Sequence, residues 1–147
     1  MAILSAENNF KRGLMAIVNG DFEEASRCFR RAIDIQQQRV TDRPEWRYLS
    51  YYGLSMAKAY RPDGEAIEAC RMAADGNTIN PDLQLNLGRV YRLAGKRRLA
   101  EEAFARGLEI APEHPFLREE MRLIETAAPG GANGGRMRTA GSMRWAP

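Results

Sequence analysis

Apolar residues recur at helical spacing along most of the chain. In the stretch LGRVYRLAG, Leu87, Val90, Tyr91 and Ala94 fall at positions i, i+3, i+4 and i+7, which is the spacing of one helix face. Helix formers dominate the composition and runs of β-branched residues are few, so we predict an all-α protein. Gly88 interrupts this helix, although a glycine there costs about 1 kcal/mol relative to alanine. Its presence therefore needs a specific cause.

The same arrangement occurs three times. Each segment has a first helix containing a glycine, a turn, and a second helix with the pattern Ala-x3-(Phe/Cys)-x2-(Ala/Gly). The glycines are Gly13, Gly53 and Gly88, and the second-helix patterns begin at Ala25, Ala66 and Ala100. Between the helices lie the turn signals Asn-Gly-Asp, Arg-Pro-Asp-Gly and Ala-Gly-Lys. Because glycine has no Cβ, we expect each one to let the partner helix approach closely.

The third segment resembles the tetratricopeptide repeat family. It carries the motifs L-G-x2-Y, A-x3-F and a terminal proline at Leu87-Gly88, Tyr91, Ala100, Phe104 and Pro112. The resemblance implies a right-handed superhelix of three helix-turn-helix repeats with a C-terminal capping helix. We expect a domain at 1–126, with repeats at about 6–40, 46–79 and 81–114 and the capping helix at about 115–126. Residues 127–147, which contain glycine and arginine, are expected to form a flexible tail.

The first repeat departs from this period. The step from the second to the third pattern is 34 residues, the family period, whereas the step from the first to the second is 41. Seven residues correspond to about two helical turns. We therefore predict that the second helix of the first repeat extends to about Val40, and that Pro44 begins the next repeat.

The charge distribution disfavours nucleic-acid binding by the folded part. The chain has 22 basic and 19 acidic residues. Three of the basic residues, Arg136, Arg138 and Arg144, follow the last acidic residue, Glu125. The preceding part is thus formally neutral. No signal peptide or membrane-length apolar run is evident, and we expect a cytoplasmic protein in which Cys28 and Cys70 are small buried residues.

Candidate catalytic chemistry is scarce. The single histidine, His114, lies in a Glu-His-Pro turn, where we expect an exposed loop side chain. There is no Cys/His cluster and no phosphate-binding glycine loop after a strand. We therefore expect a protein that is not an enzyme and that has no metal site and no cofactor.

A second stripe on the first helix of each pair indicates a binding surface. In proteins that this chain resembles, such stripes line the concave inner surface of the superhelix and hold an extended peptide or a helix. The candidate groove residues grade from apolar to basic: Phe10, Leu14, Ile17, Arg47, Ser50, Leu54, Lys58, Leu85, Arg89 and Arg92. Such a surface would suit a protein partner with apolar anchors and a carboxylate, which arginine can bind through two hydrogen bonds.

Other interpretations of these residues stay open. The apolar group at Phe10 could pack on Ile3 and Leu4 or on a second subunit, and the arginines could be solvated surface residues. The family's carboxylate clamp uses lysines and asparagines at fixed positions, of which only Asn86 is matched here. Binding to the acidic C-termini of chaperones is therefore not expected. The size and repeat count are also similar to those of bacterial type III secretion chaperones.

The sequence thus favours a protein-interaction module, an adaptor or chaperone-like scaffold. One alternative is an assembly subunit that self-associates into a homo-oligomer. Another is weak binding of nucleic acid or an acidic surface by the tail, where three arginines and Trp145 could neutralise and stack on a single strand. Three phosphate contacts would make this attachment weak and salt-sensitive. No membrane partner is expected.

Overall fold

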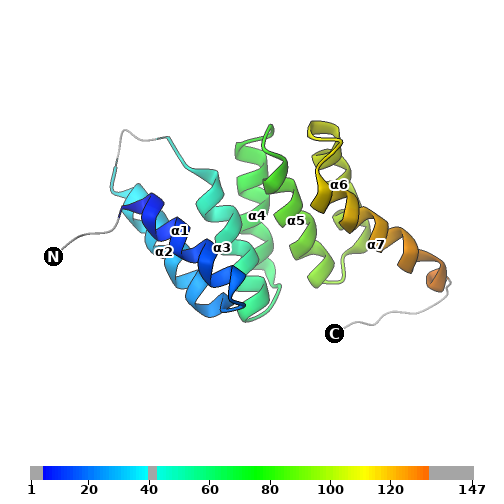
Figure 1. The fold of residues 1–147 in the computed structure, drawn as a ribbon, viewed down its shortest axis with the longest axis horizontal. Helices are drawn as coiled ribbons and strands as arrows, with labels where there is room; N and C mark the ends of the chain where they lie inside the picture. Colours follow the sequence, from blue (N-terminus) through cyan, green and yellow to red (C-terminus); the bar gives the residue numbers. More distant parts are fainter. Residues whose placement is uncertain (1–4, 40–42, 133–147) are drawn as a thin grey trace.

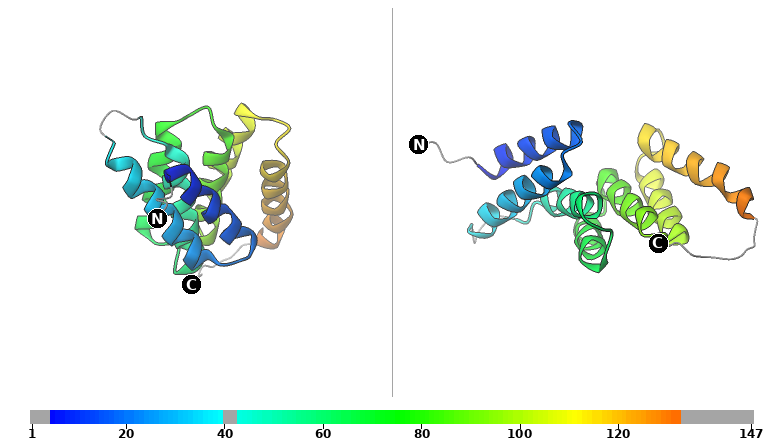
Figure 2. Two further views of the ribbon diagram at one scale, coloured as in Figure 1. Left: turned by 60° about the vertical axis from the view of Figure 1, so that its left-hand side comes forward. Right: turned by 90° about the horizontal axis from the view of Figure 1, so that it is seen from below.

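The structure, a computed structural model, describes residues 5–39 and 43–132, and every regular element within these ranges is a helix. The described helices form three consecutive antiparallel pairs followed by a single C-terminal helix (Figure 1). Seen from below, they follow an arc with the first and last helices at its two ends (Figure 2). The all-α fold is thus confirmed. The helices are α1 (Ala6–Val18), α2 (Phe22–Gln37), α3 (Trp46–Ala59), α4 (Gly64–Gly76), α5 (Pro81–Leu93), α6 (Arg97–Ile110) and α7 (Pro115–Ala132).

Short polar side chains set where most of the helices begin. Asp21 and Asp63 accept hydrogen bonds from backbone N–H groups three residues on, at 3.0 and 3.1 Å, and so satisfy donors that have no partner within the helix. Asn80 caps α5 in a similar way, and Pro81 follows as its first residue, where the missing N–H carries no penalty. These caps start the second helix of two pairs and the first helix of the third.

Two glycines end first helices. Gly20 and Gly95 have φ values of 78° and 77°, a left-handed conformation that side chains with a Cβ rarely adopt. Each follows the last turn of its helix, α1 or α5, and reverses the chain into the second helix of the pair. The Asn-Gly-Asp and Ala-Gly-Lys turns predicted from the sequence are therefore present.

The mid-helix glycines lie where the two helices of a pair touch. A Cβ added at Gly13 would lie 2.5 Å from Cε1 of Phe29. One added at Gly88 would overlap the ring of Phe104 in the same way. At Gly53 the obstacles are the Cys70 sulfur, at 2.7 Å, and a backbone carbonyl. Close packing of the partner helix thus explains all three glycines.

The core consists of two apolar clusters. The larger one spans α3 to α7 and contains Leu83, Leu87, Phe104 and Leu117. The smaller one joins α1 and α2 to the start of α3 through Phe10, Phe29 and Tyr48. Tyr51 packs against both clusters. Cys28 and Cys70 are free thiols buried within the pairs, as expected.

The long connection after the first pair differs from the prediction. Helix α2 has 16 residues, against 13 for α4 and 14 for α6, but it ends at Gln37 and not near Val40. Val40 and Thr41 are weak helix formers, and residues 40–42 lie outside the described part. Pro44 precedes the next helix, which begins at Trp46 after the cap residue Glu45.

The capping helix is longer than predicted. Helix α7 continues to Ala132, six residues beyond the end predicted at residue 126. The prediction began the tail at residue 127 because the sequence from there on holds five glycines and no acidic residue and lacks apolar periodicity. Ala127 and Ala128 are instead strong helix formers and extend α7 beyond Thr126. The rest of the expected tail, residues 133–147, lies outside the described residues.

Candidate partner-binding surface

The residues predicted to line the groove fall into two groups. Phe10, Ser50, Leu54 and Leu85 are buried, with exposed fractions of 5% or less, so they do not form an open surface. The other six remain accessible to a partner: Leu14, Ile17, Arg47 and Arg89 are half-buried, and Lys58 and Arg92 are exposed. The accessible surface is therefore smaller than the predicted groove and lies around these six positions.

Phe10 is buried because aromatic residues of two neighbouring helices surround it. Its ring centroid lies 5.5 Å from that of Phe29 on α2, 5.2 Å from Tyr48 and 5.6 Å from Tyr51 on α3. These separations are typical of favourable aromatic pairs. The alternative that Phe10 packs on Ile3 and Leu4 involves residues outside the described part.

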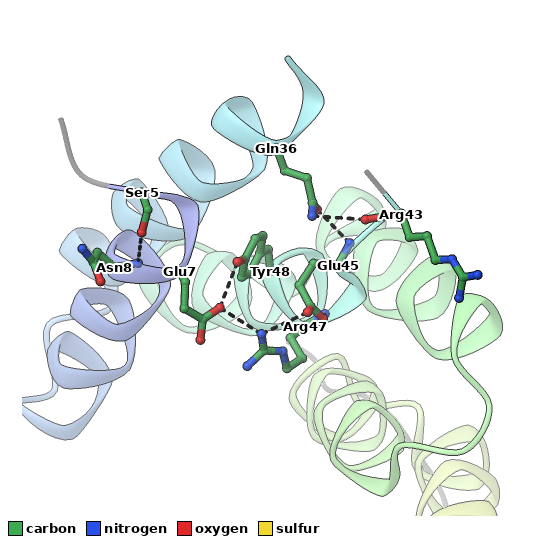
Figure 3. Close-up of polar contacts among 8 residues, drawn as sticks. All are labelled: Ser5, Glu7, Asn8, Gln36, Arg43, Glu45, Arg47 and Tyr48. Carbon is green, nitrogen blue, oxygen red and sulfur yellow. Dashed lines mark hydrogen bonds and ion pairs between the residues drawn. The ribbon is translucent and has the colours of Figure 1, made fainter. Parts of the chain in front are cut away.

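Arg47 links α1 to α3 and is not a free cation. One of its terminal nitrogens lies 2.9 Å from Oε1 of Glu7 and 3.0 Å from Oε2 of Glu45 (Figure 3). Its guanidinium also lies 4.7 Å from the centroid of the Phe10 ring, within cation–π range. Hydrogen bonds from Arg47 lower the pKa of the Glu45 carboxyl because they stabilise its charged form.

Tyr48 completes this link. Its hydroxyl donates to Oε1 of Glu7 at 3.0 Å (Figure 3). Burial, reinforced by the neighbouring Glu7 carboxylate, raises the pKa of Tyr48 to about 12, because both effects disfavour the phenolate. Glu7 therefore joins the N-terminal turn of α1 to two consecutive residues of α3.

The polar groups at the centre of the predicted groove bind to each other. Asn86 Nδ2 donates to Ser50 Oγ at 3.0 Å, and the Cys70 thiol donates to the Ser50 carbonyl at 3.2 Å. Both Ser50 and Asn86 are buried. Asn86 is the only residue that matched the carboxylate clamp, and it is used here to connect α5 to α3.

The basic end of the predicted groove is matched by a carboxylate of α7. Glu120 Oε2 lies 2.8 Å from Arg89 Nε, and Glu120 Oε1 lies 3.1 Å from Arg92 Nε. The Glu120 side chain is only 7% exposed. Arg89 and Arg92 are thus both paired with Glu120, although the Arg92 side chain remains 44% exposed.

Sequence reasoning missed Glu120, although a signal was present. Leu117, Glu120 and Ile124 lie at i, i+3 and i+7 on α7, and all three are buried. A lone carboxylate within an apolar helix face requires a cationic partner when it is buried. The two arginines of α5 supply it.

His114 differs from the expectation of an exposed loop residue. Its side chain is 15% exposed, and its Nε2 lies 2.7 Å from Oδ1 of Asp82 on α5. Its Nδ1 accepts a hydrogen bond from the Leu117 N–H at 3.4 Å. His114 directly precedes Pro115, the first residue of α7, and a residue in this position can cap the helix. It thus caps α7 and connects this helix to α5.

Neither a metal site nor a membrane span is found in the described ranges. Within residues 5–39 and 43–132, no three side chains of His, Cys, Asp or Glu are grouped so that they could hold a metal ion. None of the helices described here combines the length and apolar character needed to cross a bilayer.

Comparisons with known proteins identify the repeats. The tetratricopeptide repeat family model matches residues 6–39 and 81–114, which correspond to the pairs α1–α2 and α5–α6. No curated protein matches the sequence significantly.

Several solved structures share the fold. The first tetratricopeptide repeat domain of human RPAP3 has a TM-score of 0.71 at 18% identity, covering 88% of this chain and 97% of that one. The first such domain of Spaghetti, bound to an HSP90 peptide, has a TM-score of 0.68 at 18% identity, covering 85% and 94%. PcrH in complex with the chaperone-binding region of PopB has a TM-score of 0.62 at 16% identity, covering 86% and 98%. The chain thus contains two tetratricopeptide repeats, at residues 6–39 and 81–114, and has the fold of a tetratricopeptide repeat domain.

Proposed function

We propose that the chain is a non-catalytic protein-interaction module that binds a peptide or helix of a partner protein on its inner surface. The observation that carries this proposal is the accessible row of first-helix residues Leu14, Ile17, Lys58 and Arg92. Structures of the same fold support it, since the Spaghetti domain is bound to an HSP90 peptide and PcrH is in complex with the chaperone-binding region of PopB. An adaptor or chaperone-like role in the cytoplasm is part of this proposal.

The partner chemistry follows from which side chains remain accessible. Leu14 and Ile17 offer apolar contacts at one end of the surface. Lys58 lies 5.2 Å from the centroid of the Phe22 ring and has no acidic partner among the described residues. The arginines of α5 already bind Glu120. We therefore propose that the partner presents apolar anchors and that Lys58 is the principal contact for its carboxylate.

Binding of a captured partner to variants of this chain tests the proposal. A partner isolated from native lysate is titrated against the wild-type chain, Leu14→Glu and Lys58→Glu. Arg98→Glu is the matched control, because Arg98 is 80% exposed on α6 and its reversal changes the net charge as much as Lys58→Glu and more than Leu14→Glu. The proposal expects weaker binding by both test variants and unchanged binding by the control. Unchanged affinity in both test variants would contradict it.

Self-association is the second candidate function. Met15 and Val18, near the end of α1, are 61% and 77% exposed, and exposed apolar residues of this kind often mark contacts between chains. Light scattering on the purified chain tests this directly, and a monomer at all concentrations would exclude it.

A further inference from the structure

An open cleft of about 470 Å³ lies between α2 and α3. Its α3 wall is formed by Tyr52, Met56 and Tyr60. Each of these follows a predicted groove residue, Ser50, Leu54 or Lys58, by two positions. Because successive residues of a helix are rotated by about 100°, the cleft lies on the opposite side of α3 from the groove positions. It is therefore a separate surface.

The α2 wall of the cleft is cationic. Arg27, Arg30 and Arg31 line it, together with Ser26, and no carboxylate does. Arg30 donates to the Tyr52 hydroxyl at 3.4 Å, so the two walls are in contact. The cleft thus combines three guanidinium groups with two phenol rings and one thioether.

The cations of this wall are available to a ligand. Arg27 pairs with Glu24 at 3.0 Å and Arg30 with Asp34 at 3.3 Å, and the arginine of each pair is more than half exposed. Exposed pairs of this kind are weak because water competes for both groups. Arg31 contacts the Cys28 sulfur at 3.9 Å and has no acidic partner within 4.0 Å among the described residues. Arg31 is thus the cation of this wall that has no carboxylate partner in the described part of the chain, and Arg27 and Arg30 can exchange their weakly bound carboxylates for those of a ligand.

The spacing of these groups fits an extended peptide. Arg27 and Arg31 are four residues apart on α2, or about 6 Å along the helix axis. An extended chain places alternate side chains on the same side at about 6.6 Å. Side chains between them point the opposite way, toward the α3 wall. We propose that this cleft binds an extended peptide segment with two carboxylates two residues apart and an apolar residue between them.

In this arrangement the two carboxylates contact Arg27 and Arg31, while the intervening apolar side chain contacts Met56. Tyr52 and Tyr60 are eight residues apart, about 12 Å along α3, which accommodates three to four extended residues. A peptide is favoured over a nucleic acid because single-strand binding depends on several phosphate contacts along a basic groove, whereas this cleft offers three guanidinium groups on one wall, two of which already pair with carboxylates. The proposal does not depend on the inner surface.

Nuclear magnetic resonance titration of the full chain tests the proposal. The probe is the acetylated, amidated peptide Gly-Glu-Val-Glu-Gly at low ionic strength, and its control replaces both glutamates by glutamine. The Nε–H resonances of Arg27 and Arg31 should shift saturably with the probe, and that of Arg98 should not. High salt should weaken the shifts, since it screens exposed charges. Equal binding of the glutamine peptide would overturn the proposal.

Matched variants locate the binding site. Arg31→Glu should weaken binding by about tenfold or more, because it removes a charged hydrogen bond and places a carboxylate one turn from Arg27. Arg98→Glu, with the same change in net charge, should leave the affinity unchanged. Lys58→Glu should also have no effect, which separates this cleft from the inner surface. Equal losses in Arg31→Glu and Arg98→Glu would show a general charge effect and refute the assignment.

Two further measurements complete the test. Thermal unfolding checks that the Arg31→Glu variant remains folded. If this variant is unfolded, the variants Arg31→Gln and Tyr60→Ala are measured in its place. Both lie on exposed positions, and weaker peptide binding by both would support the proposal. A single-stranded oligothymidine that shifts the same arginine resonances with higher affinity than the peptide would assign the cleft to nucleic acid and overturn it.

Discussion

The contact of Gly88 with Phe104 shows how one atom can fix the distance between two helices. Phe104 is fully buried on α6, and its ring lies where a Cβ of residue 88 would be. The ring cannot move aside without disturbing Leu87, Val90 and the other residues of the larger cluster. Glycine is therefore retained at position 88 despite its low helix propensity.

We expect Gly88→Ala to destabilise the protein. The added methyl gains about 1 kcal/mol of helix propensity, but overpacking a rigid core typically costs about 1–3 kcal/mol. Because the methyl would overlap a buried ring, the cost at this site should lie toward the upper end of that range. The net loss should be about 1–2 kcal/mol, measured by urea unfolding.

Gly64→Ala is the matched control for this prediction. Gly64 is the exposed first residue of α4, and a Cβ there meets no atom within 4 Å. The same substitution should therefore stabilise the protein by about 0.4–1 kcal/mol, through the lower entropy of the unfolded chain. Equal effects at the two positions would contradict the close-packing explanation.

The phenol of Tyr48 should titrate at a higher pH than that of an ordinary tyrosine. Its pKa rises from 10.0 to about 12 in the folded protein, so the folded state retains a proton that the unfolded state loses between these values. The contribution of about 2–3 kcal/mol is complete below pH 10 and is lost as the pH rises to 12. Tyr48→Phe should remove one phenol that titrates near pH 12 from the ultraviolet absorbance titration. Loss of a phenol that titrates near pH 10 would argue against the Glu7 contact.

At the scale of the element, α7 is held to the repeats by polar as well as apolar contacts. Leu117 is buried against Gly107 of α6, where an added Cβ would lie 2.7 Å from its Cδ1. Glu120 binds Arg89 and Arg92, and His114 binds Asp82. Three contacts with α5 therefore fix how α7 closes the end of the stack.

We expect Glu120→Gln to loosen α7. Removing one member of a buried ion pair can cost about 3–5 kcal/mol, but both arginines are partly exposed and can be hydrated, so about 1–2 kcal/mol is expected here. Amide hydrogen exchange should accelerate in α7 more than in α5. Glu119→Gln, which alters an exposed pair with Arg122 on the same helix, should leave exchange unchanged. If both variants behave alike, Glu120 does not hold α7.

The helices were predictable because local signals define them. The turn glycines, the paired Gly and Phe positions and the 34-residue step all follow from the sequence. The accessibility of the groove positions was not predictable, since it depends on the distances between helices of different repeats. Phe10 is buried by Tyr48 and Tyr51, which lie about 40 residues away in the sequence. Arg89 is paired by Glu120, whose position depends on how α7 docks.

For the whole molecule, the division of the core into two clusters has consequences for unfolding. The smaller cluster joins α1 and α2 to α3, and the larger one extends from α3 to α7. In repeat proteins each unit contacts mainly its neighbours, so stability is distributed along the chain. The connection through residues 38–45 adds length between the first pair and the rest, while Tyr51 and the Glu7–Arg47 pair maintain contact across it.

We therefore expect Phe10→Ala to destabilise the first pair selectively. Truncating a buried phenylalanine typically costs about 3–5 kcal/mol. Phe10 contacts Phe29, Tyr48 and Tyr51, and the members of its cluster all belong to α1, α2 and α3. Native-state hydrogen exchange should show faster opening of α1 and α2, with protection in α5 and α6 nearly unchanged. A uniform loss of protection over all helices would instead show that the two clusters unfold as one unit. In that case the Tyr51 and Arg47 contacts would be strong enough to couple the first pair fully to the remaining helices.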